Sequence, residues 1–597
     1  MYRLAIVFAA VLAVAVRRKQ LRRKQKGGTV MRHPTVWNPK LQETTFMKRI
    51  ILIATLSAFL PLTQGAAQDH AHAPNGSGDS TRVPLYGDLG NHHYEITTRV
   101  PKAQEYFDQG LRLYYGFNHA EAIRSFKEAQ RLDPECAMCW WGEAMAWGPN
   151  INLPMDSAGG AAANAAIPHA VSLKQGTTPK EKALIEALAE RYGPDPMANR
   201  GAQDSAYANA MAEVVRQYPD DLEVAVLYGE SIMNLRPWNY WTDEGHPQPG
   251  IPDLLTHLER VLDQNENHPG ACHFFIHTVE KVHPERAIPC AERLAGLMPG
   301  AGHIVHMPGH IYIRVGRYAD AIRANEHAVH ADETYIQDQR PGVGVYTAGY
   351  YPHNYDFLAF AASMIGRADR AIMAADKVAE VIPENLLGAP GFTFLQHYGT
   401  RYLQLRVRFG RWTELLSTPA PAAELLHARA MWDYAQGRAL AATGNVEKAQ
   451  SHLVSLRAAA DHPELADATV EPNNSGDILS IASKVLEGWI ATEQDDYGAA
   501  VSALTEAARL EDGLLYGEPP EWTIPVRQDL GAVLLQAGRY AEAERVFRKD
   551  LSRFPDNGWS LFGLADALRA QGQEEETAEV EARFREVWKG SDLRPST

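Results

Sequence analysis

The pattern of apolar and small residues repeats along most of this 597-residue chain with a period of about 34 residues. In the clearest unit, residues 103–136, apolar positions follow a helical period, stop at a short polar turn and then resume. Small residues where two helices cross, an aromatic residue between them and a final proline predict a pair of packed antiparallel helices. These positions are Gly110, Ala122, Phe126, Ala129 and Pro134.

The same template fits two further segments, residues 303–334 and 526–557. Weaker copies occupy residues 354–383, 433–456 and 486–510. Because each unit holds one helix hairpin, the pattern predicts hairpins stacked along most of the chain. We divide this array into an N-terminal part, residues 101–335, which carries unusual histidine-rich repeats, and a C-terminal part, residues 336–590.

This pattern resembles the tetratricopeptide repeat (TPR) superfamily over most of residues 100–590. The resemblance implies an all-α fold, a TPR-like α-solenoid of antiparallel helix hairpins with irregular loop insertions. The period is interrupted at residues 148–203, 237–252 and 339–352, and long insertions in a tight array are usually functional or cover a groove. The phrases CAMCWWGEA, HFFIHTVE, GHIVHMPGHIYIRVGRY and EPPEW resemble a group of exported bacterial TPR proteins of unassigned activity, which implies a fold and a compartment but no chemistry.

The N-terminal residues indicate export. Residues 47–67 combine a basic start, an apolar stretch and a small-residue end, which is typical of a secretory signal peptide. Residues 1–46 are predicted to be an upstream extension from an earlier start codon, with a membrane anchor as the alternative, and residues 68–100 form a polar leader. We therefore expect a periplasmic or secreted protein without stable membrane insertion after signal cleavage.

The net negative charge of the chain limits the kinds of molecule that it can bind. Residues 1–67 hold 12 basic residues and 1 acidic residue, so 46 basic and 72 acidic residues remain after their removal, a net charge of −26. A chain this acidic is a poor candidate for binding nucleic acid or an anionic membrane surface. The remaining candidate partner is a peptide or protein held in the concave groove of the array.

The four cysteines favour disulfides or buried thiols over a cofactor site. In an oxidising compartment Cys136, Cys139, Cys272 and Cys290 allow three pairings, between which the sequence does not choose. The first two have the spacing of a haem attachment site, but Trp140 stands where the required histidine would be, so we expect no haem. A CxxC pair without a second pair is also weak support for zinc.

The histidines between residues 268 and 310 are concentrated far beyond what a helical repeat requires. Each residue of an α-helix turns by about 100°, so residues three, four or seven apart share a face. Two sets do so in successive repeats: His273, His277 and Glu280, then His303, His306 and His310. By its resemblance to TPR proteins, this part of the array presents the histidines to the concave groove, with His353 at a matching position of the next unit.

Pro308 complicates the second set, because proline removes a backbone hydrogen bond and delays a helix start. We therefore expect His303 and His306 on a turn, with only His310 firmly helical.

Convergent imidazoles favour a borderline transition metal, namely zinc, copper or iron. The leading hypothesis is a groove that binds such an ion for metal handling or a metal-dependent reaction, through His273, His277, His303, His306, His310 and His353. One alternative is a non-enzymatic scaffold in which the histidines hydrogen-bond to a peptide or partner protein. Another is a metal-dependent hydrolase with Glu280 as general base.

Overall fold

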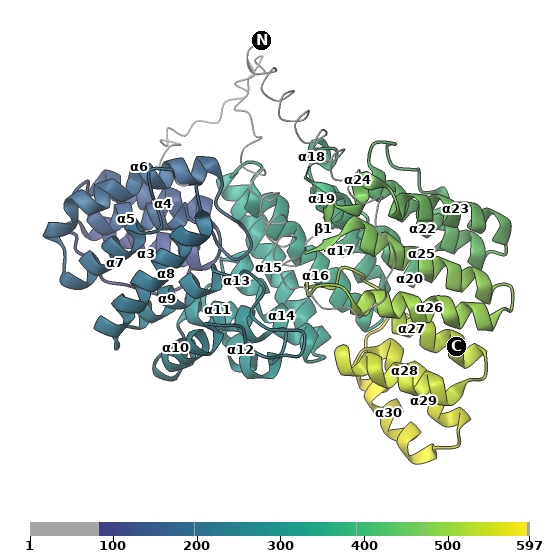
Figure 1. Ribbon diagram of the computed structural model, residues 1–597. Helices are drawn as coiled ribbons and strands as arrows, with labels where there is room; N and C mark the ends of the chain where they lie inside the picture. Colours follow the sequence, from purple (N-terminus) through teal and green to yellow (C-terminus); the bar gives the residue numbers. More distant parts are fainter. Residues whose placement is uncertain (1–82, 196, 390, 471, 594–597) are drawn as a thin grey trace, which may run out of the picture. The chain divides into compact units, whose positions relative to one another are not determined.

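A computed structural model describes residues 83–593 except Pro196, Pro390 and Glu471, and these residues are almost entirely helical (Figure 1). The upstream extension 1–46 and the signal peptide 47–67 lie outside the described residues, as does the first part of the leader. From Val83 onward the leader follows an irregular path and buries Leu89, Tyr94 and Ile96 against the helices. Within the described part of the chain, no helix is long and apolar enough to cross a membrane.

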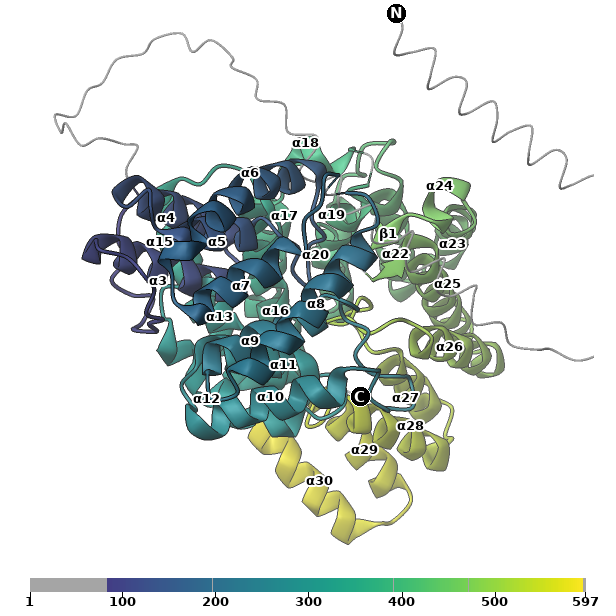
Figure 2. The same ribbon diagram turned by 60° about the vertical axis from the view of Figure 1, so that its left-hand side comes forward.

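The N-terminal array begins with helix pairs joined by short turns and then reaches the histidine-bearing helices. Its elements are α3 (Pro101–Tyr115), α4 (His119–Leu132), α5 (Ala137–Ala146), α6 (Ser157–Leu173), η1 (Lys174–Gly176), α7 (Pro179–Ala189), α8 (Arg200–Gln217), α9 (Leu222–Met233), α10 (Ile251–Gln264), α11 (Pro269–Val279), η2 (Pro284–Ala287), α12 (Ile288–Leu297), α13 (Gly302–His306), α14 (Pro308–Arg314) and α15 (Tyr318–Gln339). Successive helices α9, α10 and α11 lie side by side (Figures 1 and 2).

The C-terminal array continues the same arrangement, with one small two-stranded sheet. Its elements are η3 (Tyr346–Tyr350), α16 (Tyr351–Met364), α17 (Ala368–Val381), α18 (Glu384–Leu387), α19 (Thr393–Tyr398), α20 (Arg401–Arg408), α21 (Trp412–Ser417), α22 (Leu426–Ala442), α23 (Val446–Ala460), α24 (Pro463–Ala466), β1 (Thr469–Val470), β2 (Asn473–Asn474), α25 (Ser475–Thr492), α26 (Tyr497–Asp512), α27 (Val526–Gln536), α28 (Tyr540–Arg553), α29 (Gly558–Ala570) and α30 (Glu574–Val587). The two strands pair antiparallel. These helix pairs confirm the predicted all-α, TPR-like architecture.

The glycines of the repeat allow the helices to approach one another. The Phe126 ring of α4 lies between Gly110 of α3 and Gly142 of α5, and a Cβ at Gly142 would lie 2.5 Å from that ring. The last repeats use the same arrangement, in which Phe547 fills the space between Gly531 and Gly563. The predicted combination of small and aromatic positions therefore corresponds to a real contact between neighbouring repeats.

Pro308 interrupts the histidine-bearing segment at Met307, between α13 and α14. Met307 nevertheless keeps helical dihedral angles, φ −51° and ψ −36°. The expectation that His303 and His306 lie on a turn is wrong, since both belong to the short helix α13. Although Pro308 cannot donate its backbone bond, the chain continues in the same direction.

We expect Gly142→Ala to destabilise the protein by about 1–3 kcal/mol, because the added methyl group overlaps the Phe126 ring in a packed interface. Chemical denaturation followed by circular dichroism measures the change. Gly201→Ala in α8 is the matched control: no atom within 4 Å would meet its Cβ, so it should be neutral or slightly stabilising. Equal effects of the two substitutions would contradict this packing description.

Candidate metal centre

Three neighbouring segments bring the predicted site residues together in the interior. His273 and His277 come from α11, with Glu280 as the C-cap residue of that helix. The second set comes from α13 and α14, and His353 from the first turn of α16. The five histidines of the first two sets are at most 3% exposed, and His353 is half-buried. The predicted grouping is present, but the side chains lie inside the protein and do not line an open groove.

The histidines form two triads, and each could hold a metal ion. The first triad is His273, His277 and His303, and the second is His306, His310 and His353. Within each triad the possible ligand atoms lie within 4.8 Å of one another. The Nε2 atoms of His273 and His303 are 3.2 Å apart, and those of His306 and His310 are 2.9 Å apart.

Hydrogen bonds on the outer side of the rings determine which nitrogens face inward. The Nδ1–H of His273 donates to the carbonyl oxygen of Tyr115 at 2.6 Å. The Nδ1–H of His306 donates at 2.8 Å to Oδ1 of Asn325, whose own amide group donates to a backbone carbonyl and so keeps that oxygen in place. His310 Nδ1 donates to Glu518 at 2.9 Å. The Nε2 atoms of these three rings are therefore directed at their neighbours, as in metal sites with oriented histidine ligands.

Several buried polar atoms of the cluster have no hydrogen-bond partner among the described residues. They are both ring nitrogens of His277, Nδ1 of His303 and both carboxylate oxygens of Glu280. Glu280 does lie within ion-pair range of two rings, 3.5 Å from His277 Nδ1 and 3.1 Å from His310 Nδ1. Unsatisfied polar atoms are costly in an interior, and a bound ion would compensate that cost by engaging the lone pairs.

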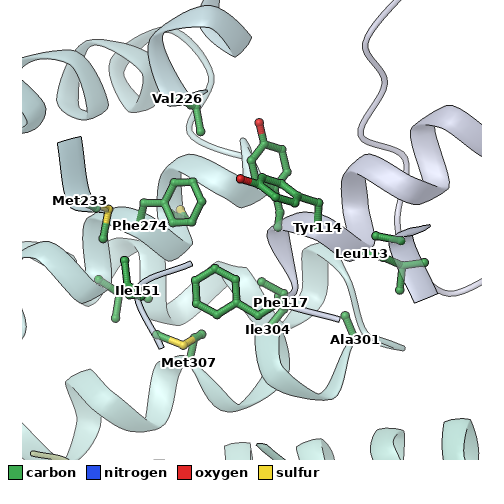
Figure 3. Packing of buried hydrophobic residues seen from close by; sticks show 14 of the residues in the cluster. Leu113, Tyr114, Phe117, Ile151, Val226, Met233, Phe274, Ala301, Ile304 and Met307 are labelled. Atoms are coloured by element: carbon green, nitrogen blue, oxygen red, sulfur yellow. The ribbon is translucent and has the colours of Figure 1, made fainter. Parts of the chain in front are cut away.

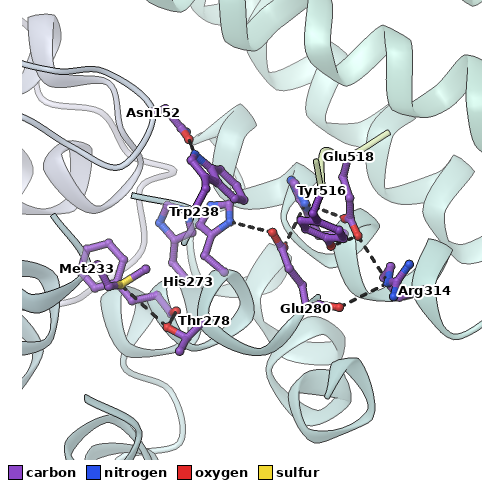
Figure 4. Close-up of polar contacts among 12 residues, drawn as sticks. Asn152, Met233, Trp238, His273, Thr278, Glu280, Arg314, Tyr516 and Glu518 are labelled. Atoms are coloured by element: carbon purple, nitrogen blue, oxygen red, sulfur yellow. Dashed lines mark hydrogen bonds and ion pairs between the residues drawn. The ribbon is translucent and has the colours of Figure 1, made fainter. Parts of the chain in front are cut away.

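Glu518 is a site residue that the sequence reasoning missed. It lies in the segment 513–525 between α26 and α27, 208 residues from His310, and its side chain is 3% exposed. Arg314 lies 3.6 Å from its other oxygen, and Tyr516 donates to it (Figure 4). The only sequence signal was the specific phrase EPPEW, which contains this residue.

Each triad packs against its own phenylalanine. The ring centroid of Phe117 lies 4.5 Å from that of His273, 5.2 Å from His303 and 6.1 Å from His277. Phe357 lies 4.5 Å from His306, 4.6 Å from His310 and 4.9 Å from His353. Phe117 also contacts the core formed by Phe274, Ile304 and Met307 (Figure 3).

Phe117 adopts a backbone conformation that is unfavourable for phenylalanine. Its φ is +54°, in the turn between α3 and α4. The corresponding turns of other hairpins use glycine at this position, and one uses Asp495. A bulky residue in this conformation stores strain, and such strain is concentrated at functional sites. Phenylalanine at a glycine position of the repeat is therefore a signal in the sequence that points to this site.

The three predicted insertions meet over the first triad. Asn152, from the first insertion, donates to the Tyr350 hydroxyl of the third and accepts from the Trp238 indole of the second. Tyr350 lies 4.7 Å from the His303 ring and Trp238 lies 5.1 Å from the His277 ring, measured between centroids. The insertion 148–203 is itself partly helical, since it contains α6 and α7. Together these segments cover the histidines.

Charge within the cluster is unevenly distributed. Burial lowers the pKa of His306, and the neighbouring His310 lowers it further. Burial also opposes protonation of His310, but the nearby carboxylates Glu280 and Glu518 outweigh it and raise the pKa of His310 to about 9. When His310 is protonated, its Nε2–H faces Nε2 of His306, and an ion bound between the two rings would have to replace that proton.

His92, Glu223 and His268 form another group of possible ligands. In this group the hydrogen bonding of His268 does not leave its Nε2 lone pair free to face an ion. His268 Nδ1 accepts a hydrogen bond from the backbone of Ala271, so the proton of the neutral ring is on Nε2. That Nε2–H faces Glu223 at 3.4 Å, and His92 Nε2 lies 3.0 Å from the same oxygen. This group is therefore a contact network around Glu223 that holds the N-terminal segment.

The cysteines take no part in the site. Cys136 pairs with Cys139 and Cys272 with Cys290, which leaves no free cysteine. The second disulfide joins α11, beside His273, to α12. The available ligand set therefore consists of imidazole nitrogens and carboxylate oxygens.

Comparison with family models and with curated proteins finds no match. Among solved structures, a chain of the APC/C hetero-tetramer Cut9–Hcn1 is 13% identical, with 82% of this chain and 76% of that chain covered and a TM-score of 0.29. Yeast Tom70 is 10% identical, with 80% and 90% covered and a TM-score of 0.27. A human IFIT1 dimer with m7Gppp-AAAA is 12% identical, with 82% and 91% covered and a TM-score of 0.28. Similarity at this level carries no argument about function.

The helix pairs of the chain itself define it as a TPR-like helical-repeat protein. Its resemblance to an exported bacterial group remains a prediction.

We expect Asn152→Ala to expose the first triad, because it removes both hydrogen bonds that join the three insertions. At about 1 kcal/mol for each of the two bonds, local opening should increase by about 30-fold. Modification by diethylpyrocarbonate, followed by peptide mass spectrometry, measures the rate at His277 and His303. Asn164→Ala in the same insertion is the control, since its amide bonds only to Gly193. Unchanged rates in Asn152→Ala would show that these bonds do not control access.

Proposed function

We propose that this protein binds transition metal ions through the buried histidine cluster and serves to hold or deliver them. One observation carries the proposal: the Nε2 atoms of His306 and His310 lie 2.9 Å apart while Nδ1 of each ring donates to a separate acceptor. Two imidazoles oriented in this way share either one proton or one metal ion. The unpartnered polar atoms of His277 and Glu280 add support.

The donor set favours zinc, copper or iron. Imidazole nitrogens suit these borderline ions, whereas calcium and magnesium require mostly oxygen ligands. Thiolate ligands are excluded because all four cysteines are in disulfides. The nitrogen-rich site therefore supports the predicted metals without choosing among them.

Metal holding fits this environment better than hydrolysis. The two oxygens of Glu280 face His277 and His310, so the carboxylate is placed to orient imidazoles. Its predicted role as general base remains a prediction. The scaffold alternative required histidines that contact a bound peptide, and burial argues against that role for these side chains. A peptide or protein partner would then bind elsewhere on the array.

We also propose export to the periplasm or the extracellular space. The two disulfides support this, because such bonds persist mainly in oxidising compartments. The high negative charge expected for the processed chain suits a freely diffusing protein.

We expect protein purified from its native export compartment to carry at least one transition metal ion per chain. The double variant His306→Ala/His310→Ala should carry less metal than wild type because it removes the closest pair of ring nitrogens. Inductively coupled plasma mass spectrometry measures the content. His452→Ala, which removes a histidine paired with Asp433 outside the cluster, is the control and should retain metal. Substoichiometric metal in wild type and double variant alike would reject the proposal.

A further inference from the structure

We infer that the cluster holds two transition metal ions side by side, one in each triad. This inference rests on the proposed function and adds to it the number of ions and their ligands. The triads share no residue, and each supplies three imidazoles. Three protein ligands with one position left for water or another molecule are a common set for zinc and related ions.

The geometry shows two separate points of convergence. His273 and His303 approach through Nε2 at 3.2 Å, and His306 and His310 do so at 2.9 Å. One ring of each pair, His273 or His306, can direct only Nε2 at an ion, because its Nδ1 is hydrogen-bonded outward. A single ion bound at one point therefore leaves the pair of nitrogens at the other point without a metal ion.

The residues that surround and orient the histidines are also duplicated. Phe117 packs on all three rings of the first triad and Phe357 on all three rings of the second. Tyr115 holds His273 in one triad, and Asn325 holds His306 in the other. Two sites that were each built for a separate ion would have this arrangement.

Glu280 lies between the two triads. One of its oxygens is 3.5 Å from His277 and the other is 3.1 Å from His310, so each triad receives one oxygen of the same carboxylate. The triads are immediate neighbours: the ring centroids of His277 and His310 are 5.2 Å apart. Glu280 and Glu518 also place two buried carboxyl groups beside the triads, and their ionised forms would reduce the cost of burying cations there. We assign Glu280 as the positioning residue shared by the two sites.

The test is a titration of the metal-free, full-length processed chain with Cu²⁺, with the bound ions counted by native mass spectrometry. Wild type should bind two ions. His273→Gln/His303→Gln should bind one, in the second triad, and His306→Gln/His353→Gln should bind one, in the first. His452→Gln is the control and should still bind two. Glutamine retains most of the buried volume, and circular dichroism confirms that each variant is folded.

Electron paramagnetic resonance gives a readout that does not depend on any variant folding. Two Cu²⁺ ions in adjoining triads interact magnetically, so wild type should show a broadened signal that integrates to well below two spins. Each double variant should give an uncoupled signal of one spin. Glu280→Gln should keep both ions but weaken their affinity by about 10–100-fold, as expected for loss of an orienting carboxylate.

The outcomes separate the two proposals. No stoichiometric metal in wild type would overturn both of them. A single ion in wild type, lost in either double variant, would overturn the two-ion inference and leave the proposed metal site intact. Two uncoupled ions, or two ions that persist in the His306→Gln/His353→Gln variant, would also overturn it, because the second ion would then lie outside these triads.

Discussion

The candidate site depends on the direction of a few imidazole hydrogen bonds. A histidine in an apolar interior can satisfy its two nitrogens in several ways, and only an outward Nδ1–H directs Nε2 inward. His273 and His306 meet this condition through a backbone carbonyl and an asparagine side chain. His268 meets the opposite condition, because the backbone of its own helix occupies its Nδ1. The same residue type therefore has different chemistry in two parts of one array.

The repeat provides the stiffness that this arrangement needs. Glycines let the site helices approach their neighbours: Gly270 of α11 faces Tyr115 of α3, and Gly309 of α14 faces Phe357 of α16. The histidines follow the helices that bear them. The insertions cover the helix faces that carry the histidines, which an array without insertions would expose to solvent. Asn152, Trp238 and Tyr350 cover the first triad and convert a surface into an interior.

Much of the fold and part of the site could be predicted from the sequence. Helix pairs are local, and their period is visible in residues such as Gly110 and Phe126. The spacing of His303, His306 and His310 similarly predicted that they lie on one face. The contribution of Glu518 was not predictable, because it depends on how repeats far apart in the chain come together. Burial of the histidines was missed for a related reason: the covering residues belong to aperiodic insertions whose path has no repeat to predict it.

The long-range bonds of the site have a consequence for the order of folding. Asn152 and Tyr350 are 198 residues apart, and His310 and Glu518 are 208 residues apart, whereas the helix hairpins close over short loops. Local hairpins form early and distant contacts form late, because each distant contact must first close a long loop. As the chain folds, the histidine faces therefore form before their cover and before the second carboxylate arrives. The surroundings of His310 are completed only after segment 513–525 brings Glu518 to it, which couples maturation of the centre to assembly of almost the whole array.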